Sequence, residues 1–116
     1  MKDFMFIFRG ATEVFQLSPE EMQQHMQKWF IWVEELKAKN VYVAGEALTP
    51  DQGKTVTGAK AMVTDGPFAE SKELVGGFFV IKAKSYEEAI EIAKGCPDLP
   101  FNGSVEVREV MKFDGM

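Results

Sequence analysis

The stretch "GGFFVIKAKSYEEAIEIAKGCP", residues 76–97, decides the fold because it joins a strand pattern directly to a helix pattern. Its first nine residues are rich in aromatic and β-branched side chains, which favour strands. Ser85 and Glu88 then have the spacing of a capping box, and the glycine and proline at the end of the stretch are typical stop signals. The inward positions of this predicted helix are Ala89, Ile90 and Ala93.

The same order of patterns occurs earlier in the chain. "FMFIF", residues 4–8, indicates a strand with apolar side chains on both faces. A helix is predicted to follow it, beginning at the capping box of Ser18 and Glu21 and ending near Asn40. At 100° per residue, one apolar stripe along this helix comprises Met22, Met26, Trp29, Val33 and Leu36.

The remaining segments complete a ferredoxin-like order. Residues 41–48 indicate a strand, a hairpin turning near Gly58 follows, and "GSVEVREVMKF", residues 103–113, alternates as a strand does. Strand, helix, strand, inserted hairpin, strand, helix and strand form the split-βαβ plan. We therefore predict an α+β fold in one domain, residues 1–116, with an antiparallel sheet and two helices on one of its faces.

The second face of that sheet needs a cover. Phe4, Phe6 and Phe8 alternate with Met5 and Ile7, so both faces of the first strand are apolar. A monomer would expose a larger apolar patch than soluble monomers usually do. We expect a homodimer that buries sheet against sheet about a two-fold axis. The alternative is that the inserted hairpin covers the face within one chain.

Composition excludes several classes of partner. The net charge is −5 and no Lys/Arg cluster occurs, which argues against nucleic acid. No apolar run of 18 residues is present and the first residues do not have a signal peptide's pattern, so we expect no membrane association and a cytoplasmic location. Cys96, the one cysteine, has no histidine near it in sequence, so we expect it to be inert packing.

Four segments carry a family resemblance. "SPEEMQQHMQKW", "VAGEALTP", "VTDGPFAESKELVGGFFVI" and "SVEVREV" together resemble the DGPF-domain proteins, also called YCII-related, in order and over nearly the whole chain. The resemblance implies a dimeric α+β barrel in which two ferredoxin-like sheets enclose a cleft. It also implies a candidate enzyme, since a histidine on the first helix and an aspartate approach one another in that cleft. Some members are encoded beside alternative sigma factors, which implies a regulatory setting.

His25 matches the family histidine, and Asp65, Gly66, Pro67 and Phe68 match the DGPF loop. The acidic partner of the shorter YCII proteins has no clear counterpart here, and either Asp65 or Glu46 can take its place.

Imidazole suits proton transfer near neutral pH, so His25 is the first catalytic candidate, with Asp65 as its partner or as a general base. The alternative for His25 is a surface side chain paired with Glu21, one helical turn away. The alternative for the loop is purely structural, because Asp-Gly-Pro sequences form turns with Pro67 fixing φ and Gly66 adopting conformations closed to other residues.

Further polar residues are candidates for binding a small-molecule ligand. If Val105 and Val107 face the helices, the charged residues between and after them point to the dimer side and line a cavity or pair with each other. The predicted substrate-binding residues are Glu46, Phe68, Lys72, Glu106 and Arg108. One histidine without a suitably spaced partner predicts no metal site, and we expect no cofactor because no phosphate-cradling glycine loop occurs.

The sequence thus favours a small-molecule-binding protein that uses His25 and Asp65 for acid–base chemistry in a dimer cleft. The alternative is a non-catalytic regulatory or interaction module, linked through the family to sigma-factor-controlled transcription. Ile31 lies about 180° from the apolar stripe, and its exposure would favour a protein contact there.

Overall fold

The computed structural model describes residues 1–50, 52–66 and 73–113. Two short 3-10 helices, η1 and η2, precede α1 and β6 and were not predicted from the sequence. In chain order the elements are β1 (Lys2–Gly10), η1 (Thr12–Gln16), α1 (Pro19–Ala38), β2 (Tyr42–Ala47), β3 (Lys54–Thr57), β4 (Met62–Asp65), β5 (Val75–Ala83), α2 (Tyr86–Ala93), η2 (Leu99–Phe101) and β6 (Gly103–Glu109).

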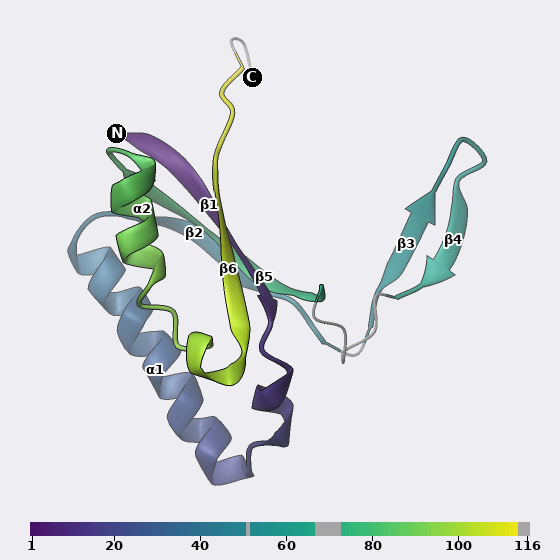
Figure 1. Ribbon diagram of the computed structural model, residues 1–116, viewed down its shortest axis with the longest axis horizontal. Coiled ribbons are helices and arrows are strands. Elements are labelled where there is room, and N and C mark those ends of the chain that lie inside the picture. Colours follow the sequence, from purple (N-terminus) through teal and green to yellow (C-terminus); the bar gives the residue numbers. More distant parts are fainter. Residues whose placement is uncertain (51, 67–72, 114–116) are drawn as a thin grey trace.

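The main sheet has the strand order β2-β5-β1-β6, and every neighbouring pair is antiparallel. Both α-helices lie on one side of it, so the predicted ferredoxin-like α+β fold is confirmed (Figure 1). The inserted hairpin, β3 and β4, forms a second sheet of its own. Within the described ranges, no helix is long and apolar enough to cross a membrane.

Alternation along β1 sets the core. Phe4 and Phe6 are fully buried beneath the helices, and the ring of Phe6 stacks on that of Trp32 in α1. On the same face of β5, Ile81 is fully buried and Phe79 nearly so. The helices are therefore held to the sheet mainly by aromatic side chains, each of which buries a large apolar area.

Capping fixes the start of α1. Ser18 accepts a hydrogen bond from the backbone N–H of Glu21, and the Glu21 carboxylate accepts one from the backbone N–H of Ser18, as the capping-box prediction requires. In α2 only half of the predicted box forms. Ser85 accepts from the backbone N–H of Glu88, whereas the Glu88 carboxylate accepts from the backbone N–H of Lys84.

The apolar stripe predicted for α1 is confirmed at Trp29, Val33 and Leu36, which pack on the core, but the centre of the buried side lies elsewhere. Its buried residues are His25, Trp32 and Leu36, whereas Met26 is 44% exposed. At 100° per residue the buried line is rotated by about 60° from the predicted one. The reason is that the large ring of Trp32 packs between the Phe6 and Phe79 rings and so turns this side of the helix toward the sheet.

One inward position of α2 was also wrong. Ala89 and Ala93 are buried as predicted, but Ile90 is 42% exposed. The two alanines are one turn apart and allow the helix to approach the sheet closely, and Ile90 lies about 100° away from that line of contact.

The double glycine at the start of β5 forms a bulge. Phe8 pairs with Gly77 and Arg9 pairs with Val75, so Gly76 is the extra residue. Gly77 has φ of +159°, and a Cβ there would lie 2.6 Å from the backbone oxygen of Glu46. The bulge thus needs glycine where β2 and β5 approach most closely.

No helix among the described residues covers the other face of the sheet. Its centre is apolar and half-buried and comprises Met5, Ile7, Phe78 and Val80, hereafter the open face. The hairpin does not fold onto it: the hairpin stands away from the rest of the chain in Figure 1, and all residues of β3 and β4 are exposed. The alternative in which the hairpin covers the sheet within one chain is therefore not observed.

Asp3 gives a prediction for stability against pH. Its carboxylate accepts hydrogen bonds from Lys112 and Lys82, at 2.7 and 3.1 Å, which lower its pKa below the ordinary value of 3.8. A group whose pKa is lower in the folded state stabilises the fold above its unfolded pKa, and this contribution is lost as the pH falls through the folded value. We expect Asp3→Asn to lower the free energy of unfolding by at most about 1 kcal/mol at pH 7, because both lysines are substantially exposed.

The difference between wild type and Asp3→Asn should shrink as the pH falls below 3.8. Urea unfolding at pH 7 and at lower pH measures it, with Glu34→Gln, an exposed helix residue, as the control. A difference that stays constant into the acid range would contradict this assignment.

Cys96 gives a second prediction. Its thiol is 4% exposed, and burial raises its pKa to about 12. Because the thiolate is the reactive form, a disulfide reagent at pH 8 should modify the native protein far more slowly than the urea-unfolded protein. Ile31→Cys, at an exposed position, serves as the positive control and should react at once. Equal rates for native and unfolded Cys96 would show that the thiol is accessible.

Candidate functional site

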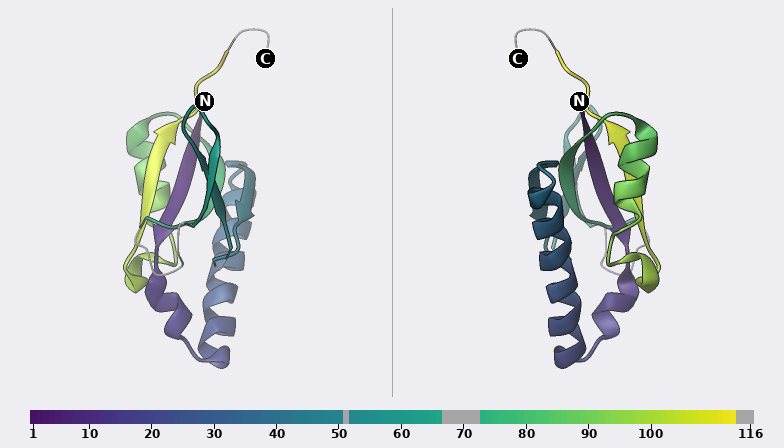
Figure 2. Two further views of the ribbon diagram at one scale, coloured as in Figure 1. Left: turned by 90° about the vertical axis from the view of Figure 1, so that its right-hand side faces the viewer. Right: turned by 90° about the vertical axis from the view of Figure 1, so that its left-hand side faces the viewer.

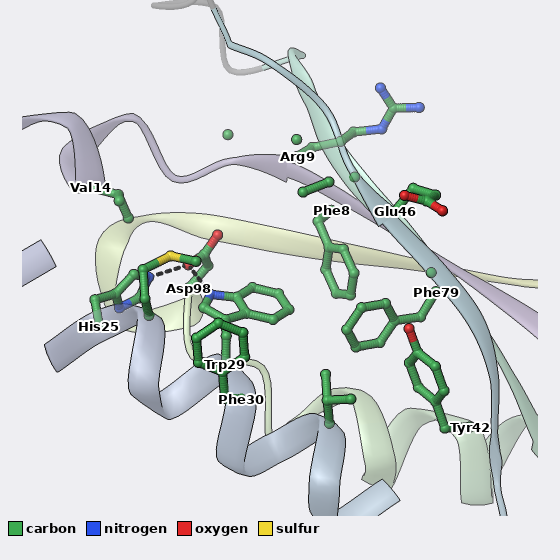
Figure 3. A pocket seen from close by; sticks show the side chains of 17 residues that line it. Phe8, Arg9, Val14, His25, Trp29, Phe30, Tyr42, Glu46, Phe79 and Asp98 are labelled. Atoms are coloured by element: carbon green, nitrogen blue, oxygen red, sulfur yellow. Dashed lines mark hydrogen bonds and ion pairs between the residues drawn. The ribbon is translucent and has the colours of Figure 1, made fainter. Parts of the chain in front are cut away.

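A pocket of about 350 Å³ opens between the first half of α1, β2 and the beginning of β5 (Figure 3). Five aromatic side chains contribute to its lining, namely Phe8, Trp29, Phe30, Tyr42 and Phe79. Pockets of this size that are lined by aromatic side chains with a few polar groups are typical of small-molecule sites.

Phe79 of β5 organises the aromatic wall. Its ring meets those of Phe8, Tyr42 and Trp29 at centroid distances of 4.9, 5.2 and 5.8 Å, in each case nearly edge to face. Edge-to-face contacts are a favoured aromatic geometry, so these four rings, each from a different element, support one another. The wall is therefore held in place without a ligand.

Asp98 provides the polar end of the pocket. Its Oδ1 accepts a hydrogen bond from His25 Nε2 at 2.6 Å and another from Trp29 Nε1 at 3.0 Å, and both are drawn in Figure 3. The side chain of Asp98 is 22% exposed and lines the pocket. Oδ2 accepts no hydrogen bond from any described residue, so one carboxylate oxygen is anchored and the other is available.

His25 is 3% exposed, and its ring meets that of Phe101 nearly edge to face at 4.7 Å. A carboxylate accepts and does not donate, so Nε2 carries the proton of the bond to Asp98. Nδ1 is buried and has no hydrogen-bond partner among the described residues. Leaving such a nitrogen unpaired costs about 1–3 kcal/mol.

Tyr42 adds a neutral hydroxyl. Burial, and after it the negative charge of Glu46, raise the pKa of the Tyr42 phenol above its ordinary value of 10.0. The phenol therefore keeps its proton at physiological pH and can donate a hydrogen bond to a ligand. Anchored carboxylate, imidazole and phenol together suit proton transfer to or from a bound molecule.

No cluster of three or more His, Cys, Asp or Glu side chains suited to a metal occurs in the described part of the chain.

The structure does not bring His25 and Asp65 together within the chain. Asp65 is the last residue of β4, its side chain is 73% exposed, and it pairs with Lys54 across the hairpin. The hairpin stands away from α1, so the two side chains do not meet within one chain (Figure 1). The alternative partner, Glu21, is engaged with Ser18, whose backbone and side-chain hydrogen bonds lower the pKa of the Glu21 carboxyl.

Three of the predicted binding residues lie on the open face. Glu106 pairs in register with Ile7, Arg108 with Met5, and Glu46 with Phe78, so their side chains share the face opposite the helices. Glu106 contacts Arg9 at 3.2 Å and Arg108 at 3.9 Å. Glu106 and Arg108 thus form the mutual pair that the sequence allowed.

Of these three, only Glu46 also borders the pocket. The remaining predicted residues, Phe68 and Lys72, lie outside the described residues, as does Pro67 of the DGPF loop. Gly66, which precedes Pro67, has φ of +119°. This is a backbone conformation that residues other than glycine rarely adopt, as expected from the sequence.

Asp98 was missed by the sequence analysis. It follows Pro97 directly, and the stretch was interpreted only as the stop signal of the second helix. The strand pairing would have indicated that Asp98 lies near His25. Gly10 pairs with Gly103, so the residues just before β6 must lie beside the segment that leads from β1 into α1, and hence near His25.

Comparisons with known proteins agree with this fold. 5-Chloro-2-hydroxyhydroquinone dehydrochlorinase from Burkholderia phenoliruptrix AC1100, solved in complex with 2,5-dihydroxybenzoquinone, has a similar structure with a TM-score of 0.50. The two are 17% identical in sequence, and the match covers 94% of this chain and 93% of the other.

A curated relative, uncharacterized protein R00369 of Rhizobium meliloti strain 1021, is 42% identical over 55 residues. That match spans 47% of this chain and 44% of the relative, so it covers less than half the length of either. The family model of the YCII-related domain matches residues 4–114, nearly the whole chain. The chain therefore belongs to the YCII-related domain family.

Proposed function

We propose that the pocket binds a small planar molecule with a hydroxylated aromatic or quinone-like ring, and that Asp98 exchanges a proton with it. The observation that carries the proposal is the double anchoring of Asp98 Oδ1 by His25 and Trp29 at the polar end of an aromatic pocket.

The aromatic wall supports a flat ligand. Rings in proteins favour offset-stacked or edge-to-face contacts, and Phe79, Phe8 and Trp29 offer both faces and edges to a ring placed among them. A volume of about 350 Å³ holds one substituted six-membered ring. The dehydrochlorinase of similar fold was solved with a ligand of this kind, 2,5-dihydroxybenzoquinone, which makes such compounds the first to test.

The anchored carboxylate supports proton transfer. His25 and Trp29 hold Oδ1, which fixes the carboxyl plane and leaves Oδ2 as the oxygen that can take a proton from a ligand hydroxyl. In that step the ligand O–H bond breaks, an O–H bond forms at Oδ2, and the negative charge passes to the ligand oxygen. A phenolic hydroxyl of Tyr42 in the same pocket can donate a hydrogen bond to that charge.

His25 acts through Asp98 in this proposal. It is almost fully buried, and the hydrogen bond from Nε2 holds Oδ1 of the carboxylate in place before the ligand arrives. The unpaired Nδ1 supports this reading because a histidine kept only for packing gains nothing from a buried nitrogen without a partner.

The test compares two carboxylates by the same substitution. Asp98→Asn keeps an oxygen that can accept from His25 and Trp29 but cannot take up a proton, so ligand binding should change by only a few-fold while turnover falls by about 10²-fold or more. Asp65→Asn, in the exposed hairpin, is the matched control and should leave both unchanged. Binding is measured by thermal shift with 2,5-dihydroxybenzoquinone and related dihydroxybenzenes, and turnover by chloride release and absorbance change with chlorinated hydroxyhydroquinones.

Two results would overturn the assignment. If none of these compounds raises the melting temperature of the protein even at concentrations well above micromolar, the proposed ligand class is wrong. If Asp65→Asn removes activity and Asp98→Asn does not, the pair expected from the sequence is the functional one, and Asp98 is a structural residue.

We also propose that the chain forms a homodimer through the open face. Its four apolar residues are flanked by charged side chains at the sheet's edges, including Glu46, Glu106 and Arg108, which is the usual anatomy of an interface with an apolar centre and a polar rim. A dimer of this kind would also give the half-buried Phe78 and Ile7 a partner surface.

Ile7→Lys tests this interface. Two lysines brought together near a two-fold axis would have to lose their hydration, so the variant should sediment at 13.0 kDa where the wild type sediments at twice that mass. Ile31→Lys on the outer surface of α1 is the control and should remain dimeric. A wild type that is monomeric at every concentration would refute the dimer.

A non-catalytic interaction module is the second candidate, and one observation favours it. Phe30 and Ile31 are 64% and 57% exposed on the outer surface of α1, where they border a shallow hollow. If the protein binds none of the ring compounds, this surface is the place to substitute. For either function we propose a cytoplasmic location, which immunoblotting of cell fractions tests.

A further inference from the structure

The hairpin of β3 and β4 carries an apolar surface that no described residue outside the hairpin is seen to cover. Val56 and Val63 pair directly across it and lie on one face, 65% and 63% exposed. Lys54 and Asp65 share that face at the base of the hairpin and pair with each other. The two valines thus form one contiguous apolar surface on this face, and contiguous exposed apolar surfaces are where partners bind.

Physical chemistry argues that this hairpin needs support. A two-stranded hairpin by itself is at best marginally stable in water and normally requires a third strand or a packing surface. Gly66 N–H donates to the backbone oxygen of Gly53 and Thr55 Oγ1 donates to that of Gly66, so the described hydrogen bonds at the base lie within the hairpin itself. They close its open end but cover neither valine.

The shape of the chain indicates where the support comes from. The radius of gyration is 15.8 Å. A compact domain of this length has about 13.4 Å. The hairpin contributes to this excess, because it projects away from the body along the longest axis in Figure 1. The views at right angles agree that it stands on the side of the sheet opposite the helices, the side of the open face (Figures 1 and 2).

Charge points to the same partner. Residues 54–65 carry two lysines and one aspartate, a net charge of +1. The whole chain has −5, so the remainder has −6. Within the hairpin Lys54 is paired with Asp65, which leaves Lys60 at the tip as the uncompensated charge. An arm with this charge is attracted to the acidic body of a second copy that approaches the open face.

We propose that the β3–β4 hairpin is a dimer arm whose Val56 and Val63 face packs on a second copy of this chain, beside the contact that the two open faces make. The inference rests on the proposed homodimer and adds a second, separable part to its interface. Two-fold symmetry makes each copy both give and receive one arm, so four valines per dimer become buried.

The experiment measures the dimer dissociation constant by sedimentation for three forms of the full chain. Val56→Thr/Val63→Thr keeps β-branched residues of the same shape but places hydroxyls where the contact needs methyls, so the dimer should dissociate at least tenfold more readily. Thr55→Ser/Thr64→Ser removes one methyl at each of two directly paired positions on the other face of the hairpin and should have little effect. The melting temperature of each variant, taken at a concentration where all are monomeric, should match that of the wild type because none of these side chains is buried within the chain.

The outcomes separate this inference from the proposed interface. If Ile7→Lys dissociates the dimer but Val56→Thr/Val63→Thr leaves the constant unchanged, the open-face dimer stands and the arm is refuted. If the valine variant weakens the dimer and Ile7→Lys does not, the arm stands and the open-face contact is wrong. A monomeric wild type, or equal weakening by the valine and threonine variants, would overturn the arm, and any partner for it would then have to be another protein.

Discussion

Hydrogen bonds to one carboxylate oxygen join distant parts of this chain. Asp98 Oδ1 accepts from His25 and Trp29 of α1, although Asp98 belongs to the loop between α2 and β6, some 70 residues later in the sequence. The contact closes the end of the molecule at which the pocket lies, because Phe101 in the same loop also packs on the His25 ring. Beside these bonds, the ring contacts of Trp29 with Phe8 and Phe79 hold this part of α1 to the sheet.

The sequence was sufficient for the architecture because the signals that specify it are local. Ser18 with Glu21, the alternation of Phe4, Phe6 and Phe8, and the glycine bulge at the start of β5 each act over a few residues. The strand order then follows from the small number of ways in which two βα units can pack. The direction of the α1 stripe was not predictable in this way, because it depends on which of several large side chains meets the sheet, and Trp32 rather than Met26 does so.

The candidate site contains one residue that the sequence singled out, His25, and one that it did not, Asp98. His25 stands out in the sequence as a lone histidine on an amphipathic helix, whereas Asp98 is one of 18 acidic residues and lies among prolines in a short loop. Its role depends on a contact that only the register of β1 with β6 brings about. Asp65 attracted attention because it begins the Asp-Gly-Pro sequence. Such a sequence is equally well explained as a turn, and the positive φ of Gly66 agrees with a turn.

The two faces of the sheet differ in what they carry. The helix face is filled by aromatic rings up to the pocket, and the open face carries apolar residues between charged borders. The pocket meets the border of the open face at Glu46 and Ala47, the end of β2, immediately before the segment that leads to the hairpin. Leu48 N–H, the next residue, donates to the backbone oxygen of Gly76, which also lines the pocket. The hydrogen bond of Leu48 and the pairing of Ala47 with Gly77 therefore fix the pocket wall at the point where the chain leaves β2 for the hairpin.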